Sequence, residues 1–164
     1  MAFRKRLRQQ AEMAPASRPA PMPRTPLSVP PCLVASASPA QQERLAECAA
    51  AAGWRPVVCA GFDSALSTVR HTLFRMALVD LTEVGSGEAT GFRKLAEHLC
   101  QQAELLLVLC GNVDAVSEEI WARQLGAWMY LPGMVSEEEL RIICRAAAEA
   151  AEKLKHAAPT VALS

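Results

Sequence analysis

Aromatic residues are scarce in this chain, and several kinds of functional motif are missing from it. Only 5% of the 164 residues are Phe, Tyr or Trp while 51% are apolar, so a core has to be built mainly from Leu, Val and Ala. The six cysteines form no C-x-x-C pair and have no histidine at a zinc-ligand spacing. No G-x-x-x-x-G-K-[ST] motif for nucleotide phosphates is present. We expect no cofactor and no metal, and we interpret the cysteines as buried free thiols in a reducing compartment.

Long hydrophobic runs are also missing. No stretch reaches the roughly 20 consecutive apolar residues that cross a membrane, and no apolar signal-peptide segment follows the basic start. A cytoplasmic protein is therefore the expectation. The length of 164 residues fits one compact domain.

The formal net charge is zero, but the charge is unevenly distributed. Residues 1–31 carry six basic side chains against one acidic, a net charge of +5, which leaves the remainder at −5. Residues 14–31 include seven prolines, so we expect residues 1–30 to be a disordered basic tail. Within it, residues 3–8 read either as a short basic helix on a partner or an anionic surface, or as a solvated tail. We expect the folded domain to cover residues 31–155 and a second disordered tail to cover residues 156–164.

From residue 31 onward, short apolar runs alternate with amphipathic segments. The runs predict five strands, at residues 32–35, 56–60, 76–79, 105–109 and 128–131. The amphipathic segments predict helices at residues 39–52, 63–73, 92–102, 114–125 and 136–154. Five strand–helix repeats favour an α/β fold of the flavodoxin-like, doubly wound type, with a five-stranded parallel sheet and helices on both faces.

Several helix boundaries carry local signals. Ser38 with Gln41, and Ser136 with Glu139, form capping-box patterns at the starts of the first and last helices. Asp63 is the expected cap of the second helix. The expected inward side of that second helix consists of Leu66, Val69 and Leu73.

One carboxylate stands out in this pattern. Asp80 ends the apolar run of residues 75–80, which places it at the carboxyl end of a buried strand. Open α/β sheets hold their functional sites at that edge. Asp80 is therefore the candidate site residue from which a function has to be argued.

Two segments resemble the receiver domain of bacterial two-component response regulators. Residues 53–66 fit the family's stretch from the end of the first helix through the second strand without a gap, and residues 126–131 resemble its Gly-Ala entry to the fifth strand. The resemblance covers about residues 31–155. It implies a receiver-type fold and a role in signal transduction, and it places Asp80 at the phospho-acceptor position.

The residues that would make Asp80 reactive differ from the family pattern. The family has two acidic residues where this chain has Ser36 and Ala37, a hydroxyl residue at Cys110, and a lysine at Gly133. Mg²⁺ needs carboxylate oxygens, and phosphoryl transfer depends on positioned charge. We therefore expect Asp80 to be a loop-capping or solvated carboxylate that is not phosphorylated by the Mg²⁺-dependent route.

The aromatic residues near the fourth helix and fifth strand suggest a contact surface. Tyr130 falls on the family's switch aromatic, but with Cys110 as its partner position we expect a static, half-buried side chain. The resemblance implies that this region serves for dimerisation and partner docking. The candidate interaction face consists of Trp121, Trp128, Tyr130 and Arg141. These aromatics read equally well as core residues, although we expect Trp121 to face the sheet less than Ile120 does.

The sequence favours a non-enzymatic pseudo-receiver, meaning a protein–protein interaction module in signalling that is not switched by phosphorylation. Its expected partners are proteins, a second copy of the chain included, and not a small-molecule substrate. One alternative is a ligand or redox sensor that uses Cys59, Cys110 or Ser36 in the cleft. A second is a phospho-accepting regulator at Asp80. A third is a scaffold attached to membrane or nucleic acid through the basic tail.

Overall fold

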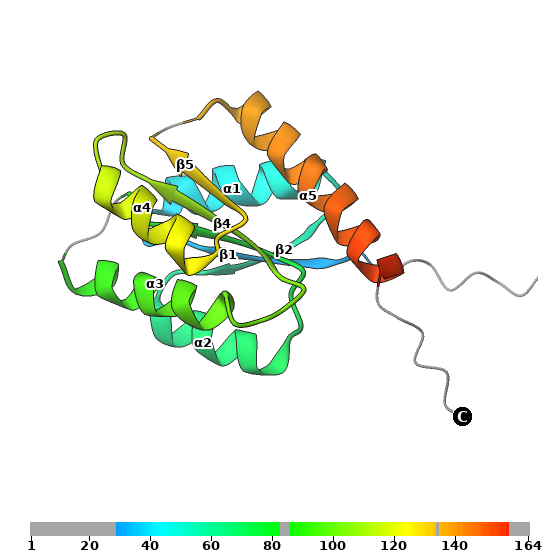
Figure 1. Ribbon diagram of the computed structural model, residues 1–164, viewed down its shortest axis with the longest axis horizontal. Coiled ribbons are helices and arrows are strands. Elements are labelled where there is room, and N and C mark those ends of the chain that lie inside the picture. Colours follow the sequence, from blue (N-terminus) through cyan, green and yellow to red (C-terminus); the bar gives the residue numbers. More distant parts are fainter. Residues whose placement is uncertain (1–28, 83–85, 134, 158–164) are drawn as a thin grey trace, which may run out of the picture.

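The computed structural model describes residues 29–82, 86–133 and 135–157, with the side chains of residues 86–89 left out (Figure 1). Its strands are β1 (Pro31–Ala35), β2 (Arg55–Cys59), β3 (Met76–Asp80), β4 (Leu106–Gly111) and β5 (Met129–Pro132). Its helices are α1 (Pro39–Ala51), α2 (Phe62–His71), α3 (Ser86–Leu99), α4 (Val116–Leu125) and α5 (Glu137–Ala157). The predicted elements are all present in the predicted order. The two expected tails lie almost entirely outside the described residues, and α5 continues two residues past the expected end of the domain at 155.

All strand pairs are parallel, and the strand order is β2-β1-β3-β4-β5. The flavodoxin-like, doubly wound arrangement is therefore confirmed. The chain moves outward from β1 to β2 and then returns to β3 on the other side of β1. In such sheets the crevice at this reversal, at the carboxyl ends of the strands, is the usual place for a site. Ser36 follows β1 and Asp80 ends β3, so both lie at that point.

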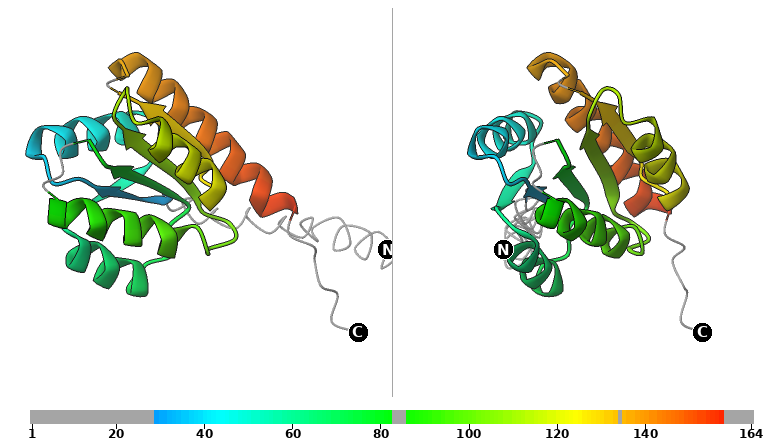
Figure 2. Two further views of the ribbon diagram at one scale, coloured as in Figure 1. Left: turned by 60° about the vertical axis from the view of Figure 1, so that its left-hand side comes forward. Right: turned by 90° about the vertical axis from the view of Figure 1, so that its left-hand side faces the viewer.

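The helices cover both faces of the sheet, with α1 and α5 on one side and α2, α3 and α4 on the other (Figure 2). Strands β3 and β4 are buried along their whole length, as continuous apolar runs in a parallel sheet require. On the α1–α5 side, the indole N–H of Trp54 donates to the carbonyl oxygen of Cys144 at 2.9 Å. Five of the six cysteines are buried free thiols, as predicted, whereas Cys100 is only partly buried.

Of the two predicted capping boxes, the one at the start of α5 forms and the one at the start of α1 forms only in part. The Ser38 hydroxyl accepts from the amide of Gln41 at 3.4 Å at the start of α1, but the Ser38 amide donates to the Ser36 hydroxyl and not to the Gln41 side chain. At the start of α5, the Ser136 hydroxyl accepts from the amide of Glu139 at 3.2 Å. The Glu139 carboxylate in turn accepts from the Ser136 amide and hydroxyl, both at 2.8 Å, and these bonds lower the pKa of Glu139. Gly126 ends α4 in the left-handed conformation, at φ 90°, that glycine adopts most easily.

Two predicted helix starts were wrong. The N-cap of α2 is Gly61 and no side chain caps it, so Asp63 lies inside the first turn, where its charge still complements the helix dipole. Helix α3 begins at Ser86, six residues before the expected start at 92. Gly91 reads as a loop residue in the sequence but lies inside this helix. A Cβ there would be 2.9 Å from the Cβ of Phe62, so this glycine allows α3 to approach the start of α2 closely.

The predicted inward side of α2 was also partly wrong. The buried residues of the helix are Ala65 and Val69, four positions apart on one face. Leu66 is only half-buried, and Leu73 is 71% exposed. The helix ends at residue 71 and Thr72 is extended, so Leu73 lies beyond the helical period that placed it on the inward face.

Helix α5 is the longest element, and its buried residues form one stripe. They are Leu140, Cys144, Ala147 and Ala151. Leu154, near the end of the helix, is 36% exposed. In the part of the chain that the structure describes, no helix combines the length and the apolar character needed to cross a membrane.

Candidate functional site

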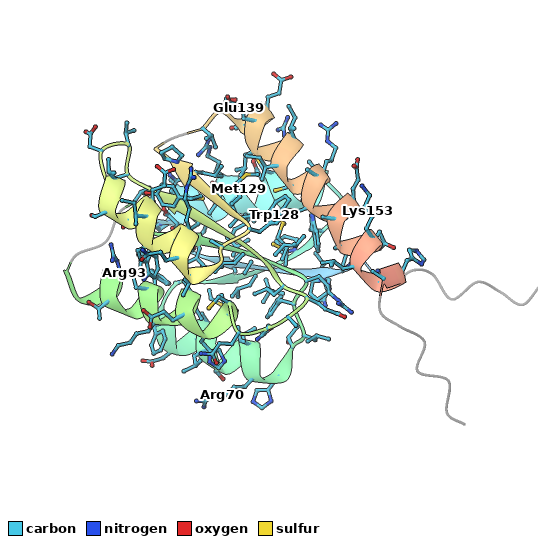
Figure 3. The ribbon with its side chains drawn as sticks, in the orientation of Figure 1. Arg70, Arg93, Trp128, Met129, Glu139 and Lys153 are labelled. Atoms are coloured by element: carbon cyan, nitrogen blue, oxygen red, sulfur yellow. The ribbon has the colours of Figure 1, made fainter. Side chains whose placement is uncertain are left out.

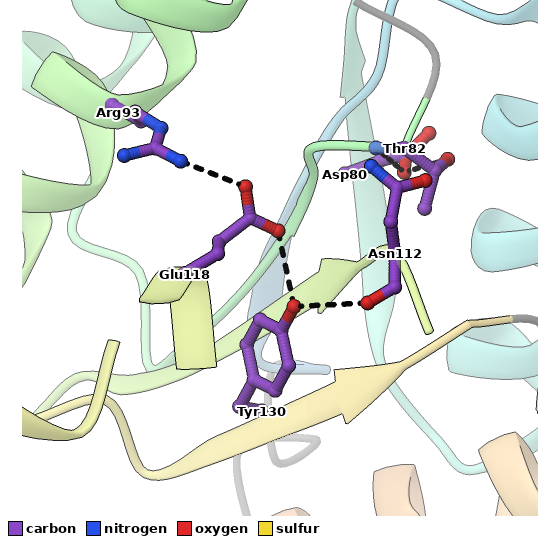
Figure 4. A network of polar contacts seen from close by, with 6 residues as sticks. All are labelled: Asp80, Thr82, Arg93, Asn112, Glu118 and Tyr130. Carbon is purple, nitrogen blue, oxygen red and sulfur yellow. Dashed lines mark hydrogen bonds and ion pairs between the residues drawn. The ribbon is translucent and has the colours of Figure 1, made fainter. Parts of the chain in front are cut away.

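Asp80 is buried, and neutral donors surround its carboxylate. The residue is 2% exposed. Its Oδ1 atom accepts from the Thr82 amide at 3.0 Å and from the Thr82 hydroxyl at 2.6 Å, a turn visible in Figure 4. Its Oδ2 atom accepts from the Ser36 hydroxyl at 2.7 Å. Both oxygens therefore have partners, and these partners are neutral hydroxyl and amide groups.

Ser36 connects this carboxylate to the end of β1. Its side chain is fully buried, and its hydroxyl also accepts from the Ser38 amide at 3.1 Å. Its carbonyl oxygen accepts from the side-chain amide of Gln42 at 2.7 Å. The residue at the family's acidic position therefore donates to Asp80 and orders the turn into α1.

The space above Asp80 is nearly closed. The cavity at this edge of the sheet has a volume of about 10 Å³. It is lined by Gln41, Arg44, Leu45, Asp80, Thr82, Cys110, Gly133, Val135 and Leu140. A cavity of that size accommodates about one water molecule. A phosphoryl group and a hydrated cation are larger than this enclosed volume.

Arg44 contributes to this closure, and sequence reasoning missed it. It reaches from α1 to donate to the carbonyl oxygen of Val135 in the segment between β5 and α5. Its positive charge opposes the rise in the pKa of Cys110. In the sequence, Arg44 is one of several polar residues on an amphipathic helix, and nothing local connects it with a residue 91 positions away.

The residues present do not fit the Mg²⁺ ion that the receiver fold implies. Asp80 is the only carboxylate among the described residues that line the cavity. Within residues 29–82, 86–133 and 135–157, no group of three or more His, Cys, Asp or Glu side chains is arranged to hold a metal. Mg²⁺ requires near-octahedral oxygen ligands, several of them anionic in sites of this type. Asp80 alone, already bonded to two hydroxyl groups, is a poor ligand set.

Cys110 does not bring a reactive thiol to the site. Burial, followed by the charge of Asp80, raises its pKa to about 12, so the thiol is protonated near neutral pH. Cys59 is buried as well, and its thiol lies 3.6 Å from the hydroxyl of Thr68 in α2. The raised pKa of Cys110 argues against the redox alternative at that position.

A second polar network lies on the other side of β4, and its central residue was also missed. Glu118 in α4 is only 7% exposed. One carboxylate oxygen accepts from Arg93 of α3 at 2.9 Å, and the other accepts from the Tyr130 hydroxyl at 3.0 Å (Figure 4). The same hydroxyl lies 3.5 Å from the carbonyl oxygen of Asn112. Tyr130 is partly buried, and burial with the neighbouring Glu118 raises its pKa to about 12.

The four residues of the candidate interaction face do not lie on one side of the sheet. Trp121 and Tyr130 pack against the core on the α2–α3–α4 side, whereas Trp128 packs on the α1–α5 side. Trp128 lies just before β5 (Figure 3). Arg141 is half-buried in α5 and pairs with Glu137 at 3.4 Å. The half-buried Tyr130 matches the expectation of a rim residue.

The expected orientation of α4 was wrong. Ile120 is 52% exposed, whereas the indole of Trp121 is half-buried and lies 5.0 Å below the guanidinium carbon of Arg93. The buried residues of this helix are Glu118 and Ala122. The helix therefore turns a charged position inward and an apolar position outward, because Arg93 and Tyr130 compensate the buried carboxylate.

Comparison with solved structures identifies the architecture. The chain matches a CheY-like response regulator receiver domain protein from Methanospirillum hungatei at a TM-score of 0.63 and 16% identity, over 77% of this chain and 99% of that one. It matches the non-phosphorylated HemR receiver domain from Leptospira biflexa at a TM-score of 0.61 and 19% identity, over 72% and 93% of the two chains. The chain has the receiver-domain fold.

A receiver domain protein from Clostridium thermocellum gives a similar match, with a TM-score of 0.62 and 15% identity over 77% of this chain and 98% of that one. By sequence, no protein-family model and no curated protein matches the chain. The receiver-like nature of the domain, expected from residues 53–66 and 126–131, is confirmed at the level of the fold.

Proposed function

We propose that this chain is a pseudo-receiver: a non-enzymatic, cytoplasmic protein–protein interaction module of a signalling system, whose binding does not depend on phosphorylation of Asp80. The observation that carries the proposal is the state of that carboxylate. Asp80 is buried and accepts from Ser36 and Thr82 under a cavity of about 10 Å³. Each carboxylate oxygen already has a hydrogen-bond partner, and the described residues enclose little volume beside it.

The charges at the site also argue against phosphorylation of Asp80. Phosphoryl transfer relies on positioned charge, and the loss of one preorganised donor typically raises a barrier by about 3 kcal/mol. Ser36, Cys110 and Gly133 stand at three positions where the family has charged or hydroxyl groups. The last of these has a backbone φ of 76°, and a Cβ on it would overlap the side chain of Val113. A lysine at residue 133 is therefore strained, and a single reversion does not rebuild the site.

The exposed side of α4 supports a role in protein contact. Val116 and Ile120, four positions apart on one face, are 66% and 52% exposed. On α5, Ile142 is 54% exposed. Large apolar side chains at the surface are ordinary when single, but a pair on one helical face offers material for a protein partner or a second copy of the chain. The basic tail of residues 1–30, with its net positive charge, is proposed to contact an anionic surface.

Intact-mass spectrometry tests the loss of phosphorylation. The full chain is incubated with acetyl phosphate and Mg²⁺, beside Asp80→Asn as the matched control. We expect both proteins to keep their unmodified mass. A phosphoryl adduct on the wild-type chain that is missing from Asp80→Asn would overturn the proposal and establish a phospho-accepting regulator.

The second measurement concerns binding. Sedimentation velocity of the full chain over a concentration series, with and without acetyl phosphate and Mg²⁺, reports self-association. We expect the association constant to be the same in both conditions and in Asp80→Asn. A change caused by acetyl phosphate in the wild type but not in Asp80→Asn would show that Asp80 still controls the contact surface.

A further inference from the structure

Glu118 joins three elements that the sequence does not connect. It lies in α4, its carboxylate pairs with Arg93 of α3 at 2.9 Å, and its other oxygen accepts from Tyr130 of β5 at 3.0 Å. Arg93 also lies 5.0 Å above the ring of Trp121, one helical turn further along α4. The cation therefore holds α4 at two points, through an ion pair and through a cation–π contact.

Because Glu118 is buried, its carboxylate needs these contacts. A carboxylate that is 7% exposed requires a countercharge and hydrogen-bond donors, since an unpaired buried charge is strongly destabilising. Arg93 supplies the charge and Tyr130 supplies a hydroxyl donor. Any rotation of α4 about its axis that moves Glu118 away would leave the guanidinium and the phenol without this partner.

Gly111 also constrains the position of Tyr130. The residue beneath its hydroxyl is Gly111, the last residue of β4, and a Cβ at that position would overlap both the Tyr130 hydroxyl and the Glu118 carboxylate. Only glycine leaves room for this pair. The network therefore depends on a small residue that immediately follows Cys110.

We infer that Glu118 is a latch: held by Arg93 and Tyr130, it sets the rotation of α4 and keeps the Val116–Ile120 side of that helix outward, whatever the state of Asp80. The rotation follows from helix geometry. Residues 118 and 122 point inward together, so residues 116 and 120, about 200° away on the helical wheel, point outward.

The latch shares no described hydrogen bond with the Asp80 site. Asp80 accepts from Ser36 and Thr82, whereas Glu118 accepts from Arg93 and Tyr130. The inference rests on the proposed function in one respect. If the module binds without phosphorylation, the latch explains how the α4 surface keeps one arrangement without it.

The single tyrosine of the chain provides a direct measurement. In an ultraviolet titration of the full chain, tyrosinate absorbance reports Tyr130 alone. Glu118→Gln should lower the observed pKa of Tyr130 while leaving it above that of a free tyrosine, because burial is the larger cause of the shift and remains. The matched control Asp80→Asn should leave the titration unchanged. An unchanged Tyr130 titration in Glu118→Gln, at pH values where both proteins are folded, would show that the carboxylate does not hold the phenol and would overturn the inference.

Hydrogen exchange of the full chain tests the consequence for the surface. Tyr130→Phe and Glu118→Gln should each speed amide exchange in α4 and β5 by about tenfold, which corresponds to about 1.4 kcal/mol of local opening, while β1 and β3 keep the wild-type rate. Asp80→Asn should not accelerate α4 or β5. Tyr130→Phe removes one oxygen only, so it keeps the test valid if Glu118→Gln fails to fold.

Unchanged exchange in α4 and β5 of both latch variants, or equal acceleration by Asp80→Asn, would overturn the inference. These results are separate from the phosphorylation assay. A phosphoryl adduct on Asp80 together with accelerated exchange in the latch variants would refute the proposed function and leave the latch standing. No adduct together with unchanged exchange would refute the latch and leave the proposed function in place.

Discussion

Replacing Ser36 by alanine should destabilise the fold by about 2 kcal/mol, a large effect for the loss of one oxygen atom. The Ser36 hydroxyl is fully buried and donates to the Asp80 carboxylate at 2.7 Å. Hydrogen bonds to charged groups contribute about 1.5–3 kcal/mol, and an unsatisfied buried group costs a similar amount. The same oxygen also accepts from the Ser38 amide, which loses its side-chain partner in the variant.

Chemical denaturation with urea measures this difference, and Ser64→Ala is the matched control. The Ser64 hydroxyl is exposed and donates to the carbonyl of Gly61 at 2.9 Å, so its loss should change the unfolding free energy by less than about 0.5 kcal/mol. In thermal unfolding, the Ser36 variant should melt about 8 °C lower, at about 4 °C per kcal/mol for a domain of this size.

The carboxylate itself can be tested in a double-mutant cycle. Asn at residue 80 keeps the shape of the side chain but removes the charge. If the hydroxyl–carboxylate bond is the source of the effect, Ser36→Ala should cost at least about 1 kcal/mol less in the Asp80→Asn background than in the wild type. Two results would refute the assignment of Ser36 as a stabilising hydrogen-bond donor to Asp80. One is an equal loss of unfolding free energy in both backgrounds, and the other is a loss of less than about 0.5 kcal/mol in the wild type.

Two further predictions concern the core and the tail. Trp121→Ala should lower the unfolding free energy by about 2 kcal/mol, because the half-buried indole packs on the core and under Arg93; unchanged stability with weaker association would instead make it an interface residue. A chain that begins at Val29 should have the thermal midpoint of the full chain within a degree or two, since residues 1–28 contain five prolines; a drop of about 4 °C, near 1 kcal/mol, would show that the tail docks on the domain.

The fold was predictable because its signals are local or periodic. The start of α1 at Ser38 and the start of α5 at Ser136 depend on residues three positions apart, and in both helices the serine hydroxyl accepts from the amide three positions further on. The central strands are continuous apolar runs, which alternation with amphipathic segments assigns to a parallel sheet. Errors occurred where tertiary contact decided the local structure. Gly91 reads as a loop residue until Phe62 is placed against it.

The candidate site was predictable only in part. The position of Asp80 at a strand end follows from the sequence, but its partners lie elsewhere: Ser36 is 44 residues away along the chain. Arg44 and Glu118 carry charges on amphipathic helices, and a charged residue in such a pattern is normally assigned to the solvated side. Only contacts at long sequence separation, to Val135 and Tyr130, show that these two side chains have specific roles.

The orientation of α4 is hard to explain by folding stability alone. Full burial of a Val or Ile side chain contributes about 1.5–3 kcal/mol, yet Val116 and Ile120 lie mostly in solvent while a carboxylate occupies the inner side of the same helix. A buried ion pair seldom stabilises a fold more than apolar residues of the same volume do. By this argument the arrangement gives up stability. The contact surface proposed on α4, held by Glu118 and independent of Asp80, would explain why that cost is kept.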